Sequence, residues 1–330
     1  MESIMFDENT LVVITGVAGF IGSNIAEKCL KLGTRVRGID NFSNGRKENI
    51  EDLMKNDKFE FIEGDICNYN ICNEICKKAD YVIHQAAWGS VPKSVKQPLD
   101  YTINNILGTH NMLQASYVNR IKTFVYASSA SVYGDNTDKV KKIGTEGNVL
   151  SPYALSKRTN EELGKLYYSL YGLNTVGLRY FNVFGRKQNP YSEYSAVIPK
   201  FVKAVLEGKD IIINGTGEQS RDFTYIDNVV EANLRACMVS KEGYGKVFNV
   251  ACGQSTSVNE LYKIIFKILN KETNVTHAIE RKGDIKNSLA DIEETKRILK
   301  YEPKYSLKQG LEKTIKWYVE NLELEEKNEN

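Results

Sequence analysis

The sequence has little of what marks a disulfide-stapled or metal-binding protein. Its six cysteines in 330 residues are too sparse for a disulfide framework. Cys67, Cys72 and Cys76 form a cluster, but it has no CxxC spacing. His110 and His277 lack acidic or cysteine companions at the spacing of metal ligands. We therefore expect buried or half-buried free thiols and no metal site.

Long apolar runs and an excess of one charge are also missing. No uninterrupted stretch of about 18 apolar residues occurs, and the N-terminal MESIMFDENT lacks a cationic segment followed by an apolar one. The 44 Lys and Arg residues nearly balance the 42 Asp and Glu residues, so no basic field favours nucleic acid. We expect a cytoplasmic protein that acts on a small molecule, with no nucleic-acid or membrane partner.

Strand-like apolar runs alternate with helical patterns over the first 180 or so residues. The runs are TLVVITG (10–16), TRVRGID (34–40), FEFIEGDI (59–66), ADYVIHQAA (79–87), IKTFVYASS (121–129) and TVGLRYFNVFG (175–185). Such alternation predicts an α/β fold, a Rossmann-type doubly wound parallel sheet with helices on both faces.

The alternation breaks after Gly185, and helical patterns dominate from Val258 onward, at 258–270, 293–300 and 307–321. A chain of 330 residues exceeds the size at which single cores stop growing, so we expect two joined domains. Residues 1–182 would form the dinucleotide-binding domain, joined by a strand from 246–253. Residues 183–330 would mainly form a smaller α/β substrate-binding lobe, and the last residues, EEKNEN, a charged and frayed tail.

A GxxGxxG motif at 16–22 lies directly after the first strand and at the start of a helix. Glycines there permit a tight turn and let backbone N–H groups approach a pyrophosphate. Asp40 follows Gly22 by 18 residues, at the end of the second strand, where a carboxylate can accept both ribose hydroxyls of an adenosine. The motif therefore predicts NAD(H) binding, although Arg46 and Lys47 lie close enough in sequence to keep NADP(H) as an alternative.

Tyr153 lies four residues before Lys157, about one helical turn, so both side chains would leave the same helix face. Read alone, the pair is an ordinary surface contact as readily as a functional one. A free phenol has a pKa near 10, and bringing it near 7 requires roughly 4 kcal/mol of preferential stabilisation of the phenolate. An ammonium and a cationic nicotinamide could supply this together, so Tyr153 could act as a base beside NAD⁺.

At these motifs the sequence resembles the extended short-chain dehydrogenase/reductases, and more closely their nucleotide-sugar 4-epimerases, over essentially the whole chain. TGVAGFIGSN is similar to the family's cofactor motif, GDI (64–66) to its adenine contact, HQAA (84–87) to a strand end beside the cofactor, and YALSK to its Tyr-x-x-x-Lys. YASSASVYG resembles the strand that carries the catalytic serine, which places that serine at Ser129. The resemblance implies catalytic roles for Tyr153, Lys157 and Ser129.

The same resemblance implies contacts to the cofactor and to a sugar nucleotide. Implied NAD contacts are Gly16, Gly19, Phe20, Ile21, Gly22, Asp40, Asn41, Asp65, Ile66, Gln85, Ala86, Ala87, Asn104, Tyr153, Lys157 and Tyr180. Implied substrate contacts are Gly89, Ser90, Ser129, Ser131, Tyr153, Asn182, Gln188, Ala196, Val197, Lys200, Asn214, Arg221, Arg281, Asp284 and Ser288. Arg221 and Arg281 would hold the diphosphate, Asn182 the sugar or diphosphate, and Lys200 the uridine end.

The residues after Ser129 bear on the reaction. Family dehydratases resemble one another in carrying adjacent Asp and Glu there, and decarboxylases a Glu, whereas this chain has Ala130 and Ser131. The resemblance therefore implies redox-neutral epimerisation: hydride leaves C4 of the sugar for NAD⁺ while Tyr153 takes the hydroxyl proton. The 4-keto sugar then turns over and receives the hydride on its other face.

Residues that would surround the sugar resemble the branch that favours N-acetylated UDP-hexosamines. Ser288, four residues after Asp284, is small where glucose-restricted epimerases carry tyrosine, and Gly89, Gln188 and Ala196 also resemble that branch. Trp88 and Ala130 depart from its pattern. The resemblance implies interconversion of UDP-N-acetylglucosamine and UDP-N-acetylgalactosamine, with UDP-glucose and UDP-galactose reacting more slowly.

Several alternatives stay open. The same motifs are compatible with a UDP-glucose 4-epimerase, a UDP-glucuronate 4-epimerase or an NADH-consuming deoxysugar reductase. A non-catalytic NAD-sensing module is an alternative hypothesis from another functional class. The helices around 101–118 and 153–171 are similar to those that pair in family dimers, with apolar positions such as Ile106, Leu113, Leu163 and Leu170. A homodimer is therefore expected by analogy, and burial of these positions within the monomer is the alternative.

Overall fold

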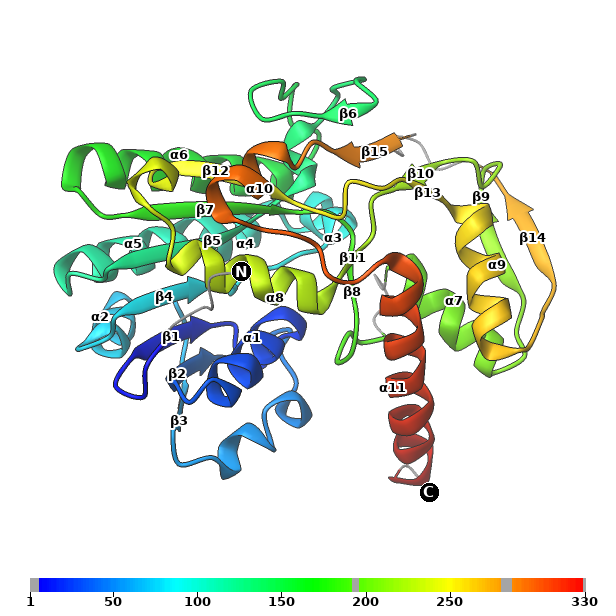
Figure 1. Ribbon diagram of the computed structural model, residues 1–330, viewed down its shortest axis with the longest axis horizontal. Helices are drawn as coiled ribbons and strands as arrows, with labels where there is room; N and C mark the ends of the chain where they lie inside the picture. Colours follow the sequence, from blue (N-terminus) through cyan, green and yellow to red (C-terminus); the bar gives the residue numbers. More distant parts are fainter. Residues whose placement is uncertain (1–5, 192–195, 280–286, 329–330) are drawn as a thin grey trace.

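The computed structural model describes residues 6–191, 196–279 and 287–328. A large sheet flanked by helices occupies one end of the molecule, and a smaller group of helices and short strands occupies the other (Figure 1). The fold is α/β, so the predicted fold class is confirmed. The exact division of the chain into two domains stays a prediction.

The large sheet is parallel and has seven strands, in the order β12-β7-β5-β4-β1-β2-β3. Its strands are β1 (Leu11–Thr15), β2 (Arg35–Asp40), β3 (Phe59–Glu63), β4 (Tyr81–His84), β5 (Thr123–Ser129), β7 (Thr175–Tyr180) and β12 (Lys246–Val250). The chain proceeds from β1 to one side and then returns to the other side with β4. Ligands of doubly wound sheets bind at this reversal, at the carboxyl ends of the strands.

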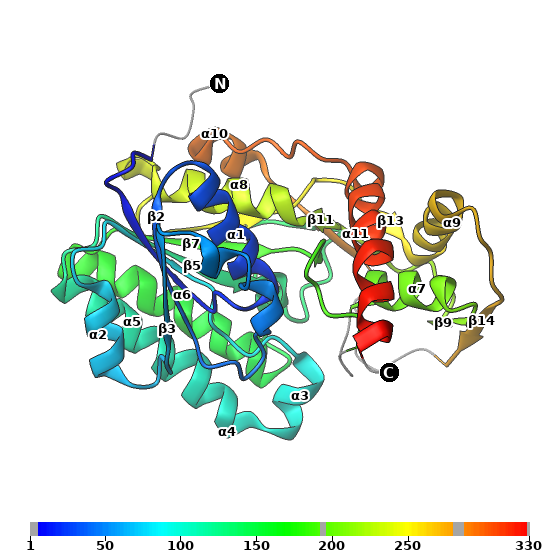
Figure 2. The ribbon, with the colours of Figure 1, turned by 90° about the horizontal axis from the view of Figure 1, so that it is seen from below.

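Helices cover both faces of the sheet (Figures 1 and 2). One face carries α1 (Phe20–Lys31), α8 (Ile226–Cys237) and α10 (Glu293–Leu299), and the other carries α2 (Tyr69–Cys76), α5 (Gly108–Val118) and α6 (Pro152–Tyr171). Strand β1 is fully buried between them, as expected for its continuous apolar run. A π-helical turn, η3 (Thr102–Leu107), joins α3 (Val91–Lys96) and α4 (Pro98–Tyr101) to α5.

The smaller part combines segments that are far apart in the sequence. Its helices are α7 (Val197–Leu206), α9 (Val258–Leu269) and α11 (Leu307–Asn328). Its short strands are β6 (Val140–Lys141), β8 (Val183–Phe184), β9 (Ile211–Asn214), β10 (Ser220–Arg221), β11 (Thr224–Tyr225), β13 (Thr256–Ser257), β14 (Val275–Ala278) and β15 (Asn287–Ala290). Helix α11 continues beyond the predicted end at 321, because the ELEEK stretch consists of good helix formers.

The thiols and the helix faces bear on two predictions. The six cysteines are buried or half-buried free thiols, as predicted. Of the apolar positions named above as possible dimer contacts, Leu113 lies fully inside the monomer core, whereas Leu170 is 67% exposed. None of the helices in the described part of the chain is long and apolar enough to cross a membrane.

Candidate active site

The glycine motif forms the turn between β1 and α1. Gly16 has a φ of +65°, which a residue with a side chain rarely adopts, and Gly19 is the N-cap of α1. A Cβ added at Gly22 would lie 2.2 Å from the carbonyl oxygen of Gly16, so only glycine lets the helix pack this closely on the turn. The first backbone N–H groups of α1 therefore lie at the carboxyl end of the sheet, where they can bind an anion.

Asp40, at the end of β2, fixes the neighbouring loop. One carboxylate oxygen accepts from the Ala18 N–H at 2.9 Å and the other from the Phe42 N–H at 2.8 Å. Burial raises the pKa of Asp40, and these backbone donors counteract part of the increase. Each oxygen keeps a second lone pair for a hydroxyl donor.

A cavity at the reversal of the sheet contains Asp40 and most of the predicted cofactor contacts. We call it the glycine-loop cavity; it is lined by Gly16, Gly19, Ile39, Asp40, Asn41, Ser43, Asn44, Gly45, Gly64, Asp65, Ile66, Gln85, Ala86, Ala87, Trp88 and Asn104. Of the other predicted contacts, Gly22 is buried under the turn and Ile21 packs on the core. In the NFSNG turn at 41–45, Asn41 was predicted as a cofactor contact, whereas Ser43, Asn44 and Gly45 were not. Their small size and polarity are typical of turn residues.

Buried polar side chains support the floor of this cavity. The Tyr180 hydroxyl donates to Asn233 Oδ1 at 3.0 Å and accepts from Gln85 Nε2 at 3.0 Å. His84 lies between the hydroxyls of Thr15 and Thr109, with Nδ1 2.7 Å from Thr15 Oγ1. Burial lowers the pKa of His84 to about 3, with a small contribution from Lys157, so the imidazole is neutral. These residues shape the site without adding charge to it.

The predicted catalytic residues meet at the end of β5 and the first turn of α6. Ser151 caps α6 by accepting from the Ala154 N–H, and Pro152 begins it, which places Tyr153 in the first turn. Lys157 Nζ lies 6.0 Å from the centre of the Tyr153 ring and donates to the Ala127 carbonyl at 2.8 Å.

Ser129, the last residue of β5, completes the group. Its Oγ accepts from Ser131 Oγ at 3.0 Å, and its hydroxyl is hydrogen-bonded to Tyr153. Helix α6 and strand β5 therefore bring a phenol, an ammonium and a hydroxyl into one polar cluster.

The pKa shifts of Tyr153 and Lys157 differ in one respect from the hypothesis based on the sequence. Burial raises the pKa of the Tyr153 phenol, and the hydrogen bond with Ser129 lowers it only in part. Burial also lowers the pKa of Lys157 to about 8, although Glu161 opposes this change. The lysine alone therefore does not make the phenol acidic, and a further positive charge is needed to stabilise the phenolate.

A second cavity, which we call the distal cavity, has a volume of about 330 Å³ and lies in the smaller part. Predicted substrate contacts at its wall are Asn182, Ala196, Val197, Lys200, Asn214 and Arg221. Apolar neighbours include Phe201, Phe223 and Val258. Basic and amide side chains above an apolar floor suit a molecule that has both an anionic group and a flat ring.

A third cavity of about 870 Å³, the central cavity, adjoins the other two. It shares Asn44, Ala87 and Trp88 with the glycine-loop cavity and Ala196 with the distal cavity. Its other lining residues are Phe20, Gly89, Ser90, Lys93, Lys96, Gln97, Tyr101, Gln188 and Asn189. The central cavity thus shares wall residues with both the glycine-loop cavity and the distal cavity.

The remaining predicted substrate contacts are placed less directly. Ser288 is buried in β15, where it pairs with Arg221 of β10, and in the described part of the chain it lines neither the central nor the distal cavity. Ser131 contacts the site through Ser129. Arg281 and Asp284 lie outside the described residues.

Trp88 and Tyr101 are central-cavity residues that the motifs did not identify as contacts. The Trp88 and Tyr101 ring centres are 5.6 Å apart, and those of Tyr101 and Tyr153 are 6.3 Å apart, both edge-on. Lys93 Nζ lies 3.9 Å from the Trp88 ring centre. Tyr101 gave no signal in the sequence, because its position depends on how α4 packs against α6.

The glycine-loop cavity fits a dinucleotide. A Cβ at Gly16 would lie 2.8 Å from the backbone of Ala86, so the two strand ends approach as closely as glycine allows and leave N–H groups of the turn for a pyrophosphate. Asp40 offers acceptors to ribose hydroxyls, and Arg46 contacts Glu48 rather than lining the cavity. The residues therefore match NAD.

Comparison with known proteins agrees with this geometry. The NAD dependent epimerase/dehydratase family matches residues 12–251. A putative UDP-glucose 4-epimerase of Methanocaldococcus jannaschii is 36% identical over 313 residues, covering 94% of this chain and 99% of that protein.

Two solved structures are also similar. The UDP-N-acetylglucosamine 4-epimerase of Methanobrevibacter ruminantium, in complex with UDP-N-acetylmuramic acid, is 39% identical with a TM-score of 0.90, covering 94% of this chain and 98% of that one. The UDP-glucuronic acid 4-epimerase of Bacillus cereus, in complex with UDP-glucuronic acid and NAD, is 31% identical with a TM-score of 0.87, covering 94% and 99%.

Proposed function

This chain belongs to the NAD dependent epimerase/dehydratase family and is an NAD-dependent UDP-sugar 4-epimerase, and we propose that its preferred reaction interconverts UDP-N-acetylglucosamine and UDP-N-acetylgalactosamine. The observation that carries this choice is the central cavity. It unites Gly89, Gln188 and Ala196, which come from distant segments and resemble the branch that favours N-acetylated substrates.

The proposed base is Tyr153. Its phenolate takes the proton from the C4 hydroxyl of the sugar. The Ser129 hydroxyl is hydrogen-bonded to the Tyr153 oxygen and keeps that oxygen aligned. Lys157, held by the Ala127 carbonyl, supplies the positive charge nearest to the phenol from the protein. Bound NAD⁺ supplies a hydride acceptor and a second positive charge, which offsets the rise that burial causes in the pKa of Tyr153.

Turnover of the keto sugar requires both an anchor and free space. In the proposed complex, Arg221, Asn182 and Lys200 hold the UDP moiety in the distal cavity. The central cavity, at about 870 Å³, leaves room for the sugar ring and an N-acetyl group to rotate. Arg281, Asp284 and Ser288 remain proposed contacts on the basis of resemblance.

One experiment distinguishes the proposed substrate from two alternatives, UDP-glucose and UDP-glucuronic acid. NMR of the C4 configuration, run separately with UDP-N-acetylglucosamine, UDP-glucose and UDP-glucuronic acid, measures kcat/KM for each. We expect the N-acetylated sugar to react fastest and UDP-glucose more slowly. A higher value for UDP-glucuronic acid would contradict the proposal, and an absorbance change at 340 nm that continues with each turnover would indicate a reductase instead.

We also propose that the chain forms a homodimer through α5 and α6. Apolar side chains on these helices and on η3 are exposed, including Leu107 (47%), Leu166 (48%) and Leu170 (67%). A second copy would cover this face, since a helix pair with the same stripe is self-complementary. Leu170→Glu should halve the mass measured by sedimentation without lowering the melting temperature strongly. A wild-type chain that sediments as a monomer would contradict the dimer.

A further inference from the structure

A buried ion-pair cluster lies beside Tyr153 and Lys157. Arg179 of β7 donates to both carboxylate oxygens of Glu161 on α6, from Nε at 2.8 Å and from Nη2 at 2.7 Å. Its remaining Nη1 pairs with Glu146, in the loop before α6. Glu161 and Arg179 are 8% and 3% exposed, so the cluster is shielded from solvent.

Glu161 also connects the two elements that carry the catalytic group. It lies four residues after Lys157 on α6, on the same helix face. One of its oxygens accepts from the hydroxyl of Ser128, which directly precedes Ser129 on β5. Lys157 in turn donates to Ala127 on the same strand. Helix α6 is therefore attached to the end of β5 at both Ala127 and Ser128.

The two carboxylates and the one guanidinium of this cluster do not balance in charge. Two carboxylates, Glu146 and Glu161, surround one guanidinium, Arg179, which leaves one net negative charge in a buried region. Buried charges are costly unless they are paired. The ammonium of Lys157, which is 4% exposed, supplies the missing positive charge.

The other groups that face Lys157 do not provide a counter-charge. His84 from β4 is neutral, because burial lowers its pKa to about 3. Tyr153 carries no charge while its phenol is protonated, and burial favours this form by raising its pKa. Burial lowers the pKa of Lys157 to about 8, and Glu161 is the group that opposes this change. Arg179 contributes a like charge, which its two carboxylates neutralise.

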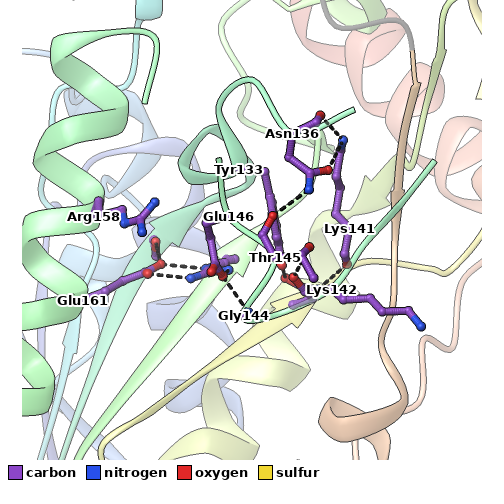
Figure 3. A network of polar contacts seen from close by, with 12 residues as sticks. Tyr133, Asn136, Lys141, Lys142, Gly144, Thr145, Glu146, Arg158 and Glu161 are labelled. Atoms are coloured by element: carbon purple, nitrogen blue, oxygen red, sulfur yellow. Dashed lines mark hydrogen bonds and ion pairs between the residues drawn. The ribbon is translucent and has the colours of Figure 1, made fainter. Parts of the chain in front are cut away.

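We propose that Glu161 is a positioning residue for the catalytic group: its carboxylate is the counter-charge of Lys157 and ties α6 to the strand end that carries Ser129. Arg179 and Glu146 hold Glu161 in place. Figure 3 shows Glu161 directed from α6 toward the loop that carries Glu146, and this loop is itself attached to α6, because Arg158 donates to the Gly147 carbonyl at 3.0 Å. The inference rests on the proposed role of Lys157, but not on which sugar reacts.

The test measures the titration of Lys157 in the full-length chain. NMR of ¹³C-lysine-labelled protein follows the Cε of Lys157, assigned with Lys157→Arg. In Glu161→Gln, we expect the midpoint to fall by about one pH unit, since an opposite charge at short range has been removed. The high-pH limb of kcat for the C4 inversion should move to lower pH by the same amount.

Glu146→Gln is the matched control. It removes the other carboxylate from Arg179 but leaves the contact with Ser128 and the helix position next to Lys157 unchanged. We expect a comparable loss of melting temperature and a smaller fall of the Lys157 midpoint, because Glu161 is the carboxylate that acts on Lys157 most directly. A midpoint that moves equally in both variants, or in neither, would overturn the proposal.

A second variant covers the case in which Glu161→Gln does not fold. Glu161→Asp keeps the charge on a shorter side chain, so we expect a midpoint between those of the wild type and Glu161→Gln. An unchanged midpoint in Glu161→Asp would then overturn the proposal. Because the NMR titration needs no substrate, its outcome is independent of the substrate assignment: loss of C4 inversion in the wild type would refute only the proposed function.

Discussion

The glycine-loop cavity and the distal cavity are built in different ways. The first is formed by the turns after β1, β2, β3 and β4, which are neighbours in one sheet, and its lining includes glycine backbones and two carboxylates, Asp40 and Asp65. The second is formed by α7, β9 and β10 together with residues 182–184, and it depends on long side chains such as Lys200 and Arg221. Backbone sites are rigid because few rotamers must be ordered, whereas side-chain sites can change specificity by substitution.

Tyr153→Phe should have the largest effect, because Tyr153 is the proposed base and its ring contacts Tyr101, which lines the central cavity. Removing the hydroxyl leaves the ring contact with Tyr101 and removes the proposed acceptor of the sugar proton. We expect C4 inversion to fall by about 10²- to 10⁴-fold. NAD released from the denatured protein should stay at the wild-type amount. Substantial residual turnover would show that another group is the base.

Gly22→Ala should disrupt the turn that forms the glycine-loop cavity. Its Cβ would lie 2.2 Å from the Gly16 carbonyl oxygen, a backbone atom that cannot move alone. We expect a loss of stability of about 3 kcal/mol or more, together with loss of bound NAD. Gly19→Ala is the control, because its Cβ would lie 3.1 Å from the same oxygen. Equal melting temperatures for the two variants would mean that the packing of α1 on the turn is not what shapes the cavity.

Asp222, between the distal-cavity residues Arg221 and Phe223, should make the stability of the protein depend on pH. Its carboxylate accepts from the N–H groups of Cys252, Gly253 and Ala290 and so joins three segments. Burial raises its pKa from 3.8 to about 6, although these donors oppose the rise.

The folded state therefore holds a proton on Asp222 that the unfolded state has released, and this contribution to stability is lost as the pH rises from about 4 to above 6. We expect the wild type to lose about 2 to 3 kcal/mol relative to Asp222→Asn over that range, measured by urea unfolding. A relative gain with rising pH would show that the backbone donors outweigh burial.

Gly89→Leu should have the smallest effect and would sharpen the contrast between the regions. No atom lies within 4 Å of a Cβ built at Gly89, so a larger side chain can enter the central cavity without displacing the backbone. We expect kcat/KM for UDP-N-acetylglucosamine to fall about tenfold relative to UDP-glucose. Gly89→Ala, which adds one methyl group, should leave the ratio nearly unchanged. A parallel loss for both sugars would argue against a cavity that selects for the N-acetyl group.

Sequence patterns predicted the first region better than the second. The GxxGxxG turn and Asp40 were predicted from local signals, glycines after a strand and an acid where a strand stops, whereas Asp65 and Gln85 were predicted by resemblance; all of them line the cavity except Gly22. Tyr101, Glu161 and Arg179 were not found as parts of the site. Their positions depend on the packing of α6 against β5 and α4, which brings together residues far apart in the chain, such as Tyr101 and Tyr153.

By itself, the sequence determined the parallel α/β fold, the dinucleotide cradle and the Tyr153–Lys157 pair, since these follow from apolar periodicity, glycine conformation and helical spacing. Only the tertiary structure decided that Lys157 is buried beside Glu161 and that the tyrosine's pKa rises rather than falls without a second cation. It also decided that Gly89, Gln188 and Ala196 share one cavity. The reason is physical: burial and Coulomb interactions depend on distance in space, and local spacing in the chain does not encode that distance.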